Sequence, residues 1–257
     1  MGQNTRTWLL TRMRTIGARV LDTAFPPVCL ACSSAVADPD GLCPACWQQL
    51  RPISAPLCPV LGLPFATAMG KGAVSVEALA DPPVFGRARS AVAYTDLARK
   101  LVSKLKYSDR PEIAIFCARM MAAAGHELLG PDALLVPVPL HAGRQRERRY
   151  NQSAELARLV ARLANRAFDP DLVYRHKRTS QQVGLNARQR ASNVSGAFRV
   201  DFARLGQCDG RRIVLVDDVL TTGATVSALA KTLKRAGAGT VDVLSFARVV
   251  FDSDMTV

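Results

Sequence analysis

Residues 213–225 read Ile-Val-Leu-Val-Asp-Asp-Val-Leu-Thr-Thr-Gly-Ala-Thr. The first four are aliphatic without alternation, which is typical of a central parallel strand covered by helices on both faces. Asp217 and Asp218 would then stand at the carboxyl end of that strand, where open α/β sheets bind ligands. A helix expected from Thr225 to Arg235 follows, and the free N–H groups of its first turn favour a phosphate. The stretch therefore predicts a pocket for a phosphate and a ribose.

The same stretch resembles the signature of the type I phosphoribosyltransferases, which is an apolar strand, two acidic residues and a Thr-Thr-Gly-x-Thr loop. The resemblance implies that Asp217 and Asp218 are the catalytic carboxylates and hold the ribose hydroxyls of phosphoribosyl pyrophosphate (PRPP). It also implies that the 5'-phosphate is wrapped by Thr221, Thr222, Gly223, Ala224 and Thr225. The alternative is an ordinary strand-to-helix turn with solvated carboxylates, but a helix cap explains one hydroxyl rather than three.

Four cysteines form two CxxC pairs separated by a short spacer: Cys29 with Cys32, and Cys43 with Cys46. Each pair turns tightly enough to present two sulfurs to one ion, and four thiolates make the closed shell of a structural zinc site. Disulfides are the alternative. They are disfavoured because the sequence shows no signal peptide and the cytosol is reducing. The other cysteines are expected to be small buried hydrophobes: Cys58, Cys117 and Cys208.

A zinc ribbon ahead of this module resembles the competence protein F family, also described as amidophosphoribosyltransferase-like. The match runs from about Cys29 to Val250 and includes four further stretches, at 105–110, 136–141, 149–152 and 182–198. Two departures stand out. The family often has Arg-Gly-Phe-Asn-Gln where this chain has Arg-Arg-Tyr-Asn-Gln at 148–152, and many members carry extra CxxC-type cysteines where this chain has Cys58 alone. The second departure argues for one zinc.

Two polar segments would complete the pocket. In the resembled fold, the loop after the strand expected at 133–138 receives the pyrophosphate of PRPP, with Mg2+ bridging its oxygens. This loop carries an arginine cluster whose paired donors suit diphosphate: Arg144, Arg146, Arg148 and Arg149. An exposed helix start is the alternative, although cations there are disfavoured without an anion. A second, flexible loop would close over the site and exclude water; it contains Arg178, Thr179, Gln182 and Arg190. Its alternative is a solvated hairpin.

The sequence predicts an α/β fold, a type I phosphoribosyltransferase-like doubly wound parallel sheet with a small N-terminal zinc ribbon. Three parts are expected: an amphipathic basic helix at 1–25, the ribbon and a Pro/Gly-rich lobe at 26–83, and the phosphoribosyltransferase-like domain at 84–257. The first is interpreted as a packing helix, with a membrane-surface or targeting role as the alternative. Further strands are expected at 90–94 and 240–250, the latter near a sheet edge, and helices at 97–106, 113–129 and 151–164. Solvation is the plain interpretation of the four positive charges in 97–106.

The net charge of +13 over 257 residues points toward phosphate-rich partners. PRPP alone needs less positive charge than this. The surplus is explained either by binding of nucleic acid or by a high-GC genome that favours arginine codons. Two functions follow. The resemblance to the phosphoribosyltransferases implies a PRPP-binding enzyme with an unknown acceptor. The resemblance to the competence protein F family implies, as the alternative, a protein that handles single-stranded DNA during uptake and uses the pocket for ligand sensing or sugar-phosphate binding. A cytoplasmic protein without membrane insertion is expected, and the oligomeric state stays open.

Overall fold

The computed structural model describes residues 26–70, 72–107, 110–140, 151–177, 187–206, 208 and 210–250. The helix expected at 1–25 lies outside these ranges. The chain forms two compact units, Met1–Gln49 and Leu50–Val257. The domain boundary placed at residue 83 from the sequence stays a proposal.

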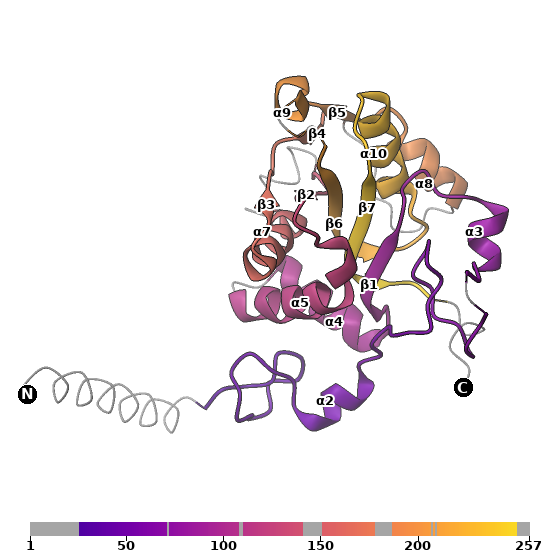
Figure 1. Ribbon diagram of the computed structural model, residues 1–257. Coiled ribbons are helices and arrows are strands. Elements are labelled where there is room, and N and C mark those ends of the chain that lie inside the picture. Colours follow the sequence, from indigo (N-terminus) through magenta and orange to yellow (C-terminus); the bar gives the residue numbers. More distant parts are fainter. Residues whose placement is uncertain are drawn as a thin grey trace, which may run out of the picture. The chain divides into compact units, whose positions relative to one another are not determined.

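The first unit is a small ribbon around the two CxxC pairs (Figure 1). Its first pair lies in a tight turn closed by an antiparallel bridge between Val28 and Ala35. The second pair starts the short helix α2 (Pro44–Gln49). The unit has little regular structure, which is typical of a domain that a metal holds together.

The second unit is built on a five-stranded parallel sheet. Its strand order is β1 (Ala88–Ala93), β7 (Val241–Arg248), β6 (Arg212–Leu220), β2 (Ala133–Pro137) and β3 (Ala167–Phe168). All neighbouring pairs are parallel, and every residue of β1, β2 and β7 is buried. The expected doubly wound parallel sheet is therefore confirmed.

Helices cover both faces of this sheet (Figure 1). Helices α5 (Pro111–Ala124) and α7 (Gln152–Ala164) pack on one face, with α4 (Asp96–Tyr107) against α5. Apolar side chains of α10 (Ala224–Arg235) meet alternate residues of β2, β6 and β7 on the other face. The remaining elements are α3 (Val76–Ala80), η1 (His126–Leu128), α8 (Ala187–Val194), α9 (Phe202–Gly206) and the antiparallel pair β4 (Val173–Arg175) and β5 (Phe198–Val200).

One expectation about a single element needs correction. The long helix expected at 113–129 ends at Ala124, because the chain turns at Gly125. A Cβ on Gly125 would come within 2.6 Å of Leu244 Cδ1, so a glycine lets the helix end approach β7 closely. Strand β2 ends at Pro137, because the closely spaced prolines at 137 and 139 cannot donate to a sheet ladder.

The strand expected near a sheet edge, β7, stands next to the edge strand β1 and is not itself an edge strand. Strand β7 pairs with β1 on one side and with β6 on the other. Its polar residues suggested exposure to solvent, but they are buried and have protein partners. Arg212 donates to Asp242 at 2.6 Å, and the Ser90 and Ser245 hydroxyls lie 2.7 Å apart. The polar alternation therefore reflects internal hydrogen bonds rather than a wet face.

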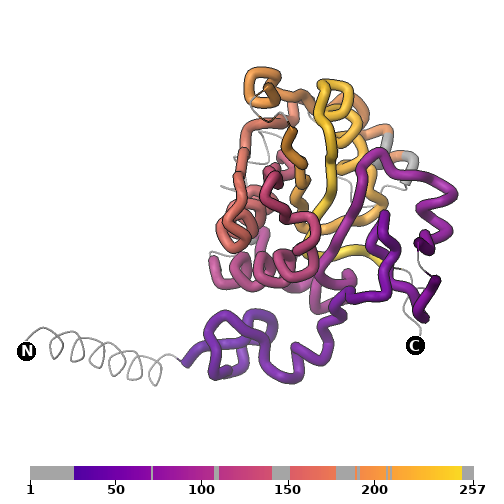
Figure 2. The backbone as a smooth tube through the Cα atoms, viewed as in Figure 1, coloured from indigo at the N-terminus to yellow at the C-terminus, as the bar shows by residue number. Residues whose placement is uncertain are grey.

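The free edge of β1 is covered by the irregular segment that precedes it. The N–H of Ile53 donates to Ala91 O at 3.0 Å, and the N–H of Ala88 donates to Val60 O at 2.8 Å. Figure 2 shows this part of the chain running alongside β1. Covering an edge strand in this way prevents it from pairing with other chains. No helix among the described residues combines the length and the apolar character that crossing a membrane requires.

Candidate functional site

The candidate site lies where β6 extends beyond the end of its neighbour β2. Strand β6 pairs with β2 up to the Val216–Pro137 partners but continues to Leu220 beside β7. The strand is thus longer than the segment 213–216 indicates. Asp217 and Asp218 follow the last residue paired with β2, so they stand at the carboxyl end of this central part of the sheet, as expected.

Asp217 is held from the side of helix α7. The hydroxyl of Ser153 donates to Asp217 Oδ1 at 3.0 Å, and the N–H of Asp218 donates to the same oxygen at 2.9 Å. Asn151 caps α7 by accepting from the N–H of Ser153 at 3.1 Å, and its amide donates to Val138 O at 3.2 Å. The cap therefore ties the helix start both to the end of β2 and to the carboxylate.

Asp218 is held from helix α4. Lys106 Nζ lies 2.7 Å from Asp218 Oδ2, with the two side chains 26% and 15% exposed. The N–H of Val219 donates to the other carboxylate oxygen at 2.8 Å. Solvation is therefore the wrong interpretation for Lys106. Its ammonium is instead paired with a carboxylate in a site largely shielded from water.

The two carboxylates have different electrostatic surroundings. Burial, followed by repulsion from Asp218, raises the pKa of Asp217 to about 7. The N–H of Asp218, the Ser153 hydroxyl and Lys106 act in the opposite direction. Burial, together with the charge of Asp218, also raises the pKa of the Cys117 thiol. Near neutral pH, Asp217 is poised between a carboxyl group that donates and a carboxylate that accepts.

We expect Asp217→Asn to change how stability depends on pH. Folding raises the pKa of Asp217 from its ordinary value of 3.8. The protonated group therefore favours the native state, and this contribution is lost as pH rises from about 4 through about 7. Asparagine does not titrate, so the melting temperature of the variant relative to the natural chain should be higher at about pH 8 than at about pH 5. Asp171→Asn, at an exposed ion pair, serves as the control. Melting curves that shift in parallel at all pH values would contradict this assignment.

The loop from Thr221 to Thr225 connects β6 to α10. Gly223 occupies the N-cap position with a φ of 75°, the left-handed region that favours glycine, and no side chain caps the helix there. Thr221, Gly223, Ala224 and Thr225 are half-buried, and Thr222 is exposed. The first turn of a twelve-residue helix thus follows directly after the two carboxylates. Such a turn offers backbone N–H groups to an anion.

Several residues expected in the site lie outside the described residues. They are Arg144, Arg148 and Arg149 of the arginine cluster, and Arg178, Thr179 and Gln182 of the second loop. Arg190, expected in that loop, lies in helix α8. The residue after the cap, Gln152, is 2% exposed, and within the described part of the chain its Nε2 atom has no hydrogen-bond partner. A buried amide of this kind is a donor that a ligand could satisfy.

The four cysteines of the ribbon come together as expected. Their sulfur atoms all lie within 4.8 Å of one another, and the Sγ atoms of Cys32 and Cys43 are 3.6 Å apart. A tetrahedral zinc with Zn–S bonds of about 2.3 Å requires sulfurs roughly 3.8 Å apart, so the geometry fits this ion. Among the described residues, no other group of cysteine, histidine or acidic side chains has such an arrangement. Cys58 and Cys117 are fully buried and Cys208 is half-buried.

Comparison with protein families matches both parts of the chain. A double zinc ribbon domain model matches residues 20–76, and a phosphoribosyl transferase domain model matches residues 152–249. The second match contains both carboxylates, the loop that follows them, and Ser153.

Similar proteins extend these matches over most of the chain. DNA utilization protein YhgH of Salmonella typhimurium is 36% identical over 217 residues, covering 82% of this chain and 91% of that protein. Competence protein F of Haemophilus influenzae is 30% identical and covers 81% of this chain and 91% of its own. The chain belongs to the competence protein F family. A more distant member of this family, Competence protein ComFC of Bacillus subtilis, is 25% identical and covers 77% of this chain and 80% of its own.

Proposed function

We propose that this competence protein F family member binds PRPP together with Mg2+ and transfers its phosphoribosyl group to an acceptor. The observation that carries the proposal is the pair Asp217 and Asp218 at the end of β6, held by Ser153 and Lys106 and followed at once by the start of α10. The pair supplies acceptors for two sugar hydroxyls, and the helix start supplies donors for a phosphate. PRPP contains both groups, since its ribose carries free hydroxyls and a 5'-phosphate.

The ribose hydroxyls would replace water on the two carboxylates. The partners of Asp217 described above bind Oδ1, and Lys106 binds Oδ2 of Asp218, so other acceptor lone pairs remain for a ligand. Hydroxyl groups that donate to a carboxylate favour its ionised form, so bound PRPP would lower the pKa of Asp217 from about 7. The positive charge of Lys106 would favour the same state.

The diphosphate needs cationic partners. The arginines of 144–149 are proposed to supply them, because the described residues that flank this segment, Leu140 and Asn151, follow β2 and precede α7 at the same end of the sheet. Substrate oxygens and water would mainly hold the Mg2+ ion. The carboxylate and hydroxyl oxygens of the site suit hydrogen bonds to its bound water. When bound, Mg2+ neutralises charge on the leaving diphosphate. The Nε2 atom of Gln152, which has no partner among the described residues, is a further donor in this region.

Calorimetric titration of the zinc-loaded protein with PRPP tests this proposal. We expect saturable binding at one site per chain that weakens strongly when Mg2+ is replaced by chelator. Ribose 5-phosphate should bind more weakly, because it lacks the diphosphate. No heat of binding with PRPP and Mg2+, from protein whose folding is verified by circular dichroism, would contradict the proposal.

Single-stranded DNA is the second candidate ligand. Two observations favour it: the net charge of +13, and relatives whose names refer to DNA utilization and competence. Binding through phosphates would weaken about tenfold or more between low and physiological salt, measured by fluorescence anisotropy of a labelled strand. Affinity that does not change with salt would exclude such an interface. Four cysteines that hold one metal must stay reduced, and this requirement supports our proposal that the protein works in the cytoplasm.

A further inference from the structure

The first zinc knuckle has a recognisable backbone pattern. The N–H of Cys29 donates to Ser34 O at 2.8 Å, and the N–H of Ser33 donates back to Cys29 O at 3.0 Å. Ser33 has a left-handed φ of 65°. The turn is closed by a 2.9 Å hydrogen bond from Val36 N–H to Pro27 O. These bonds fold the chain so that both cysteines of the pair face one point.

Residues 56–65 repeat this pattern at every step. The N–H of Cys58 donates to Leu63 O at 2.8 Å, and the N–H of Gly62 donates back to Cys58 O at 2.8 Å. Gly62 has a left-handed φ of 64°, as Ser33 has. The ends of the turn are again joined, by a 2.8 Å hydrogen bond from residue 65 to residue 56. Cys58 therefore corresponds to Cys29, and Leu61 stands where the first knuckle has Cys32.

The second half of the ribbon is repeated as well. In the first ribbon, the residue before α2 is Cys43, whose N–H donates to Cys29 Sγ at 3.3 Å. In the second, the residue before α3 is Ser75, whose N–H donates to Cys58 Sγ at 3.4 Å. The third residue of each helix is buried. The positions that correspond to the four zinc ligands are therefore Cys58, Leu61, Ser75 and Ala78.

We propose that residues 56–80 are a second zinc ribbon that has lost its metal and keeps its fold without it. The name of the matching family model implies two ribbons, but a leucine and an alanine have no lone pair for zinc, and one thiolate with a serine does not hold it. Apolar contacts replace the ion: Cys58, Leu63 and Ala78 form a buried cluster that Leu61 and Val74 pack against. The chain would thus carry one zinc, at Cys29, Cys32, Cys43 and Cys46.

The metal-free knuckle is also fixed from outside by the sheet. The buried guanidinium of Arg89 in β1 donates to Pro59 O at 3.1 Å, and that of Arg248 at the end of β7 donates to Leu61 O. A Cβ on Gly62 would lie 2.3 Å from Ala88 O, so the knuckle touches the β1 backbone directly. These contacts tie the knuckle to the otherwise free edge of β1 and offset the loss of the ion.

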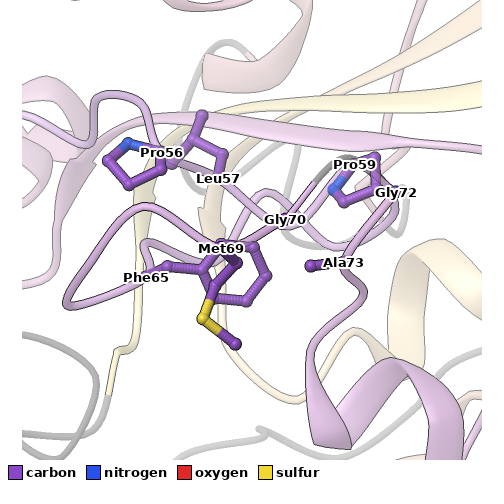
Figure 3. A pocket seen from close by; sticks show the side chains of 8 residues that line it. All are labelled: Pro56, Leu57, Pro59, Phe65, Met69, Gly70, Gly72 and Ala73. Carbon is purple, nitrogen blue, oxygen red and sulfur yellow. The ribbon is translucent and has the colours of Figure 1, made fainter.

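The described residues around this ribbon do not form a set of substitute ligands. A pocket of about 200 Å3 next to it is lined by apolar side chains and glycines, including Leu57, Phe65 and Met69 (Figure 3). None of the residues that line the pocket carries a thiol, imidazole or carboxylate. A metal in this lobe would therefore have Cys58 as its sole thiolate ligand among the described residues of the lobe.

Zinc stoichiometry tests the proposal directly. We expect one zinc per natural chain, measured by mass spectrometry of the metal content in protein purified with excess zinc and then desalted. The variant Leu61→Cys/Ser75→Cys/Ala78→Cys completes a tetrathiolate with Cys58 and should hold two. Two zinc ions in the natural chain, or one in this folded variant, would overturn the proposal.

A control variant places the same number of cysteines in the wrong geometry. Leu61→Cys/Val76→Cys/Leu79→Cys moves two of the thiols from ligand positions to the exposed face of α3, where Val76 is 77% and Leu79 is 68% exposed, so it should keep one zinc. Two zinc ions in this control would mean that any added thiols capture metal, and would also count against the correspondence of positions. Cobalt-substituted samples distinguish a true tetrathiolate from loosely bound metal by their tetrahedral sulfur spectrum.

A second measurement decides the matter if the triple variants do not fold. Cys58→Ala in the natural chain should leave the zinc content at one, and a chelator should leave hydrogen-exchange protection of residues 56–65 unchanged. Loss of zinc from Cys58→Ala, or loss of protection on chelation, would show that the second ribbon depends on metal. Neither result depends on PRPP binding, so these experiments test this proposal independently of the proposed function.

Discussion

The double variant Asp217→Asn/Asp218→Asn is expected to bind PRPP at least about 100-fold more weakly than the natural chain. Each carboxylate would accept a ribose hydroxyl, and a hydrogen bond to a charged group contributes about 1.5–3 kcal/mol. Losing two such bonds weakens binding by roughly 3–6 kcal/mol, and about 1.4 kcal/mol corresponds to tenfold in affinity. The substitution keeps the size of both side chains, so the loop at Thr221–Thr225 should retain its fold.

Calorimetry in the presence of Mg2+ measures this loss. Asp171→Asn is a matched control, since Asp171 is 68% exposed and pairs with Arg204 rather than with the site. It should bind PRPP as the natural chain does. The single variant Asp218→Asn isolates the contribution of this one carboxylate, which also pairs with Lys106. Affinity within about threefold of the natural value in the double variant would mean that the ribose is held elsewhere.

The core of the site could be predicted from the sequence because it is local. Strand, carboxylates, loop and helix follow one another in residues 213–225, so a single stretch determines how they are arranged. The first ribbon is equally local, since each CxxC pair forms its own turn. Patterns of this kind need no knowledge of which strands are neighbours.

The partners of the carboxylates could not be predicted in this way. Ser153 reaches Asp217 because β2 lies beside β6, and the sequence alone does not give that strand order. Lys106 stands in a helix with three other positive charges, so nothing local distinguishes it from a solvated residue. Its position at the helix end, at the start of a stretch that resembles the family, is the signal that could have drawn attention to it.

The metal-free ribbon and the burial of the polar residues of β7 were missed for related reasons. A search for cysteine pairs finds Cys58 alone, because the repeat survives in backbone hydrogen bonds rather than in ligands. In β7, Asp242 and Ser245 resemble residues that face solvent, yet each is paired with a polar side chain from a neighbouring strand. Sequence patterns report which residues are polar, and they do not report whether the partner is water or protein.

The variant Cys43→Ser is expected to unfold the first ribbon. The buried residues of this unit within 26–49 are three of the four cysteines with two small or medium apolar residues: Cys29, Leu30, Ala31, Cys43 and Cys46. So small a core does not stabilise a fold alone, whereas a structural zinc contributes ~10–16 kcal/mol of apparent binding free energy. Replacing one thiolate should remove the ion and, with it, hydrogen-exchange protection across 26–49.

Cys208→Ser is the matched control, because Cys208 lies in the second unit and its thiol donates to Arg204 O, which a hydroxyl can also do. It should keep its zinc and its protection. PRPP affinity should stay within about threefold in both variants, since Asp217, Asp218, Ser153 and Lys106 all belong to the unit Leu50–Val257. Zinc loss that leaves 26–49 protected would show that apolar packing holds this ribbon too, as we propose for the second. Zinc loss that abolishes PRPP binding would instead show that the ribbon supports the phosphoribosyl site.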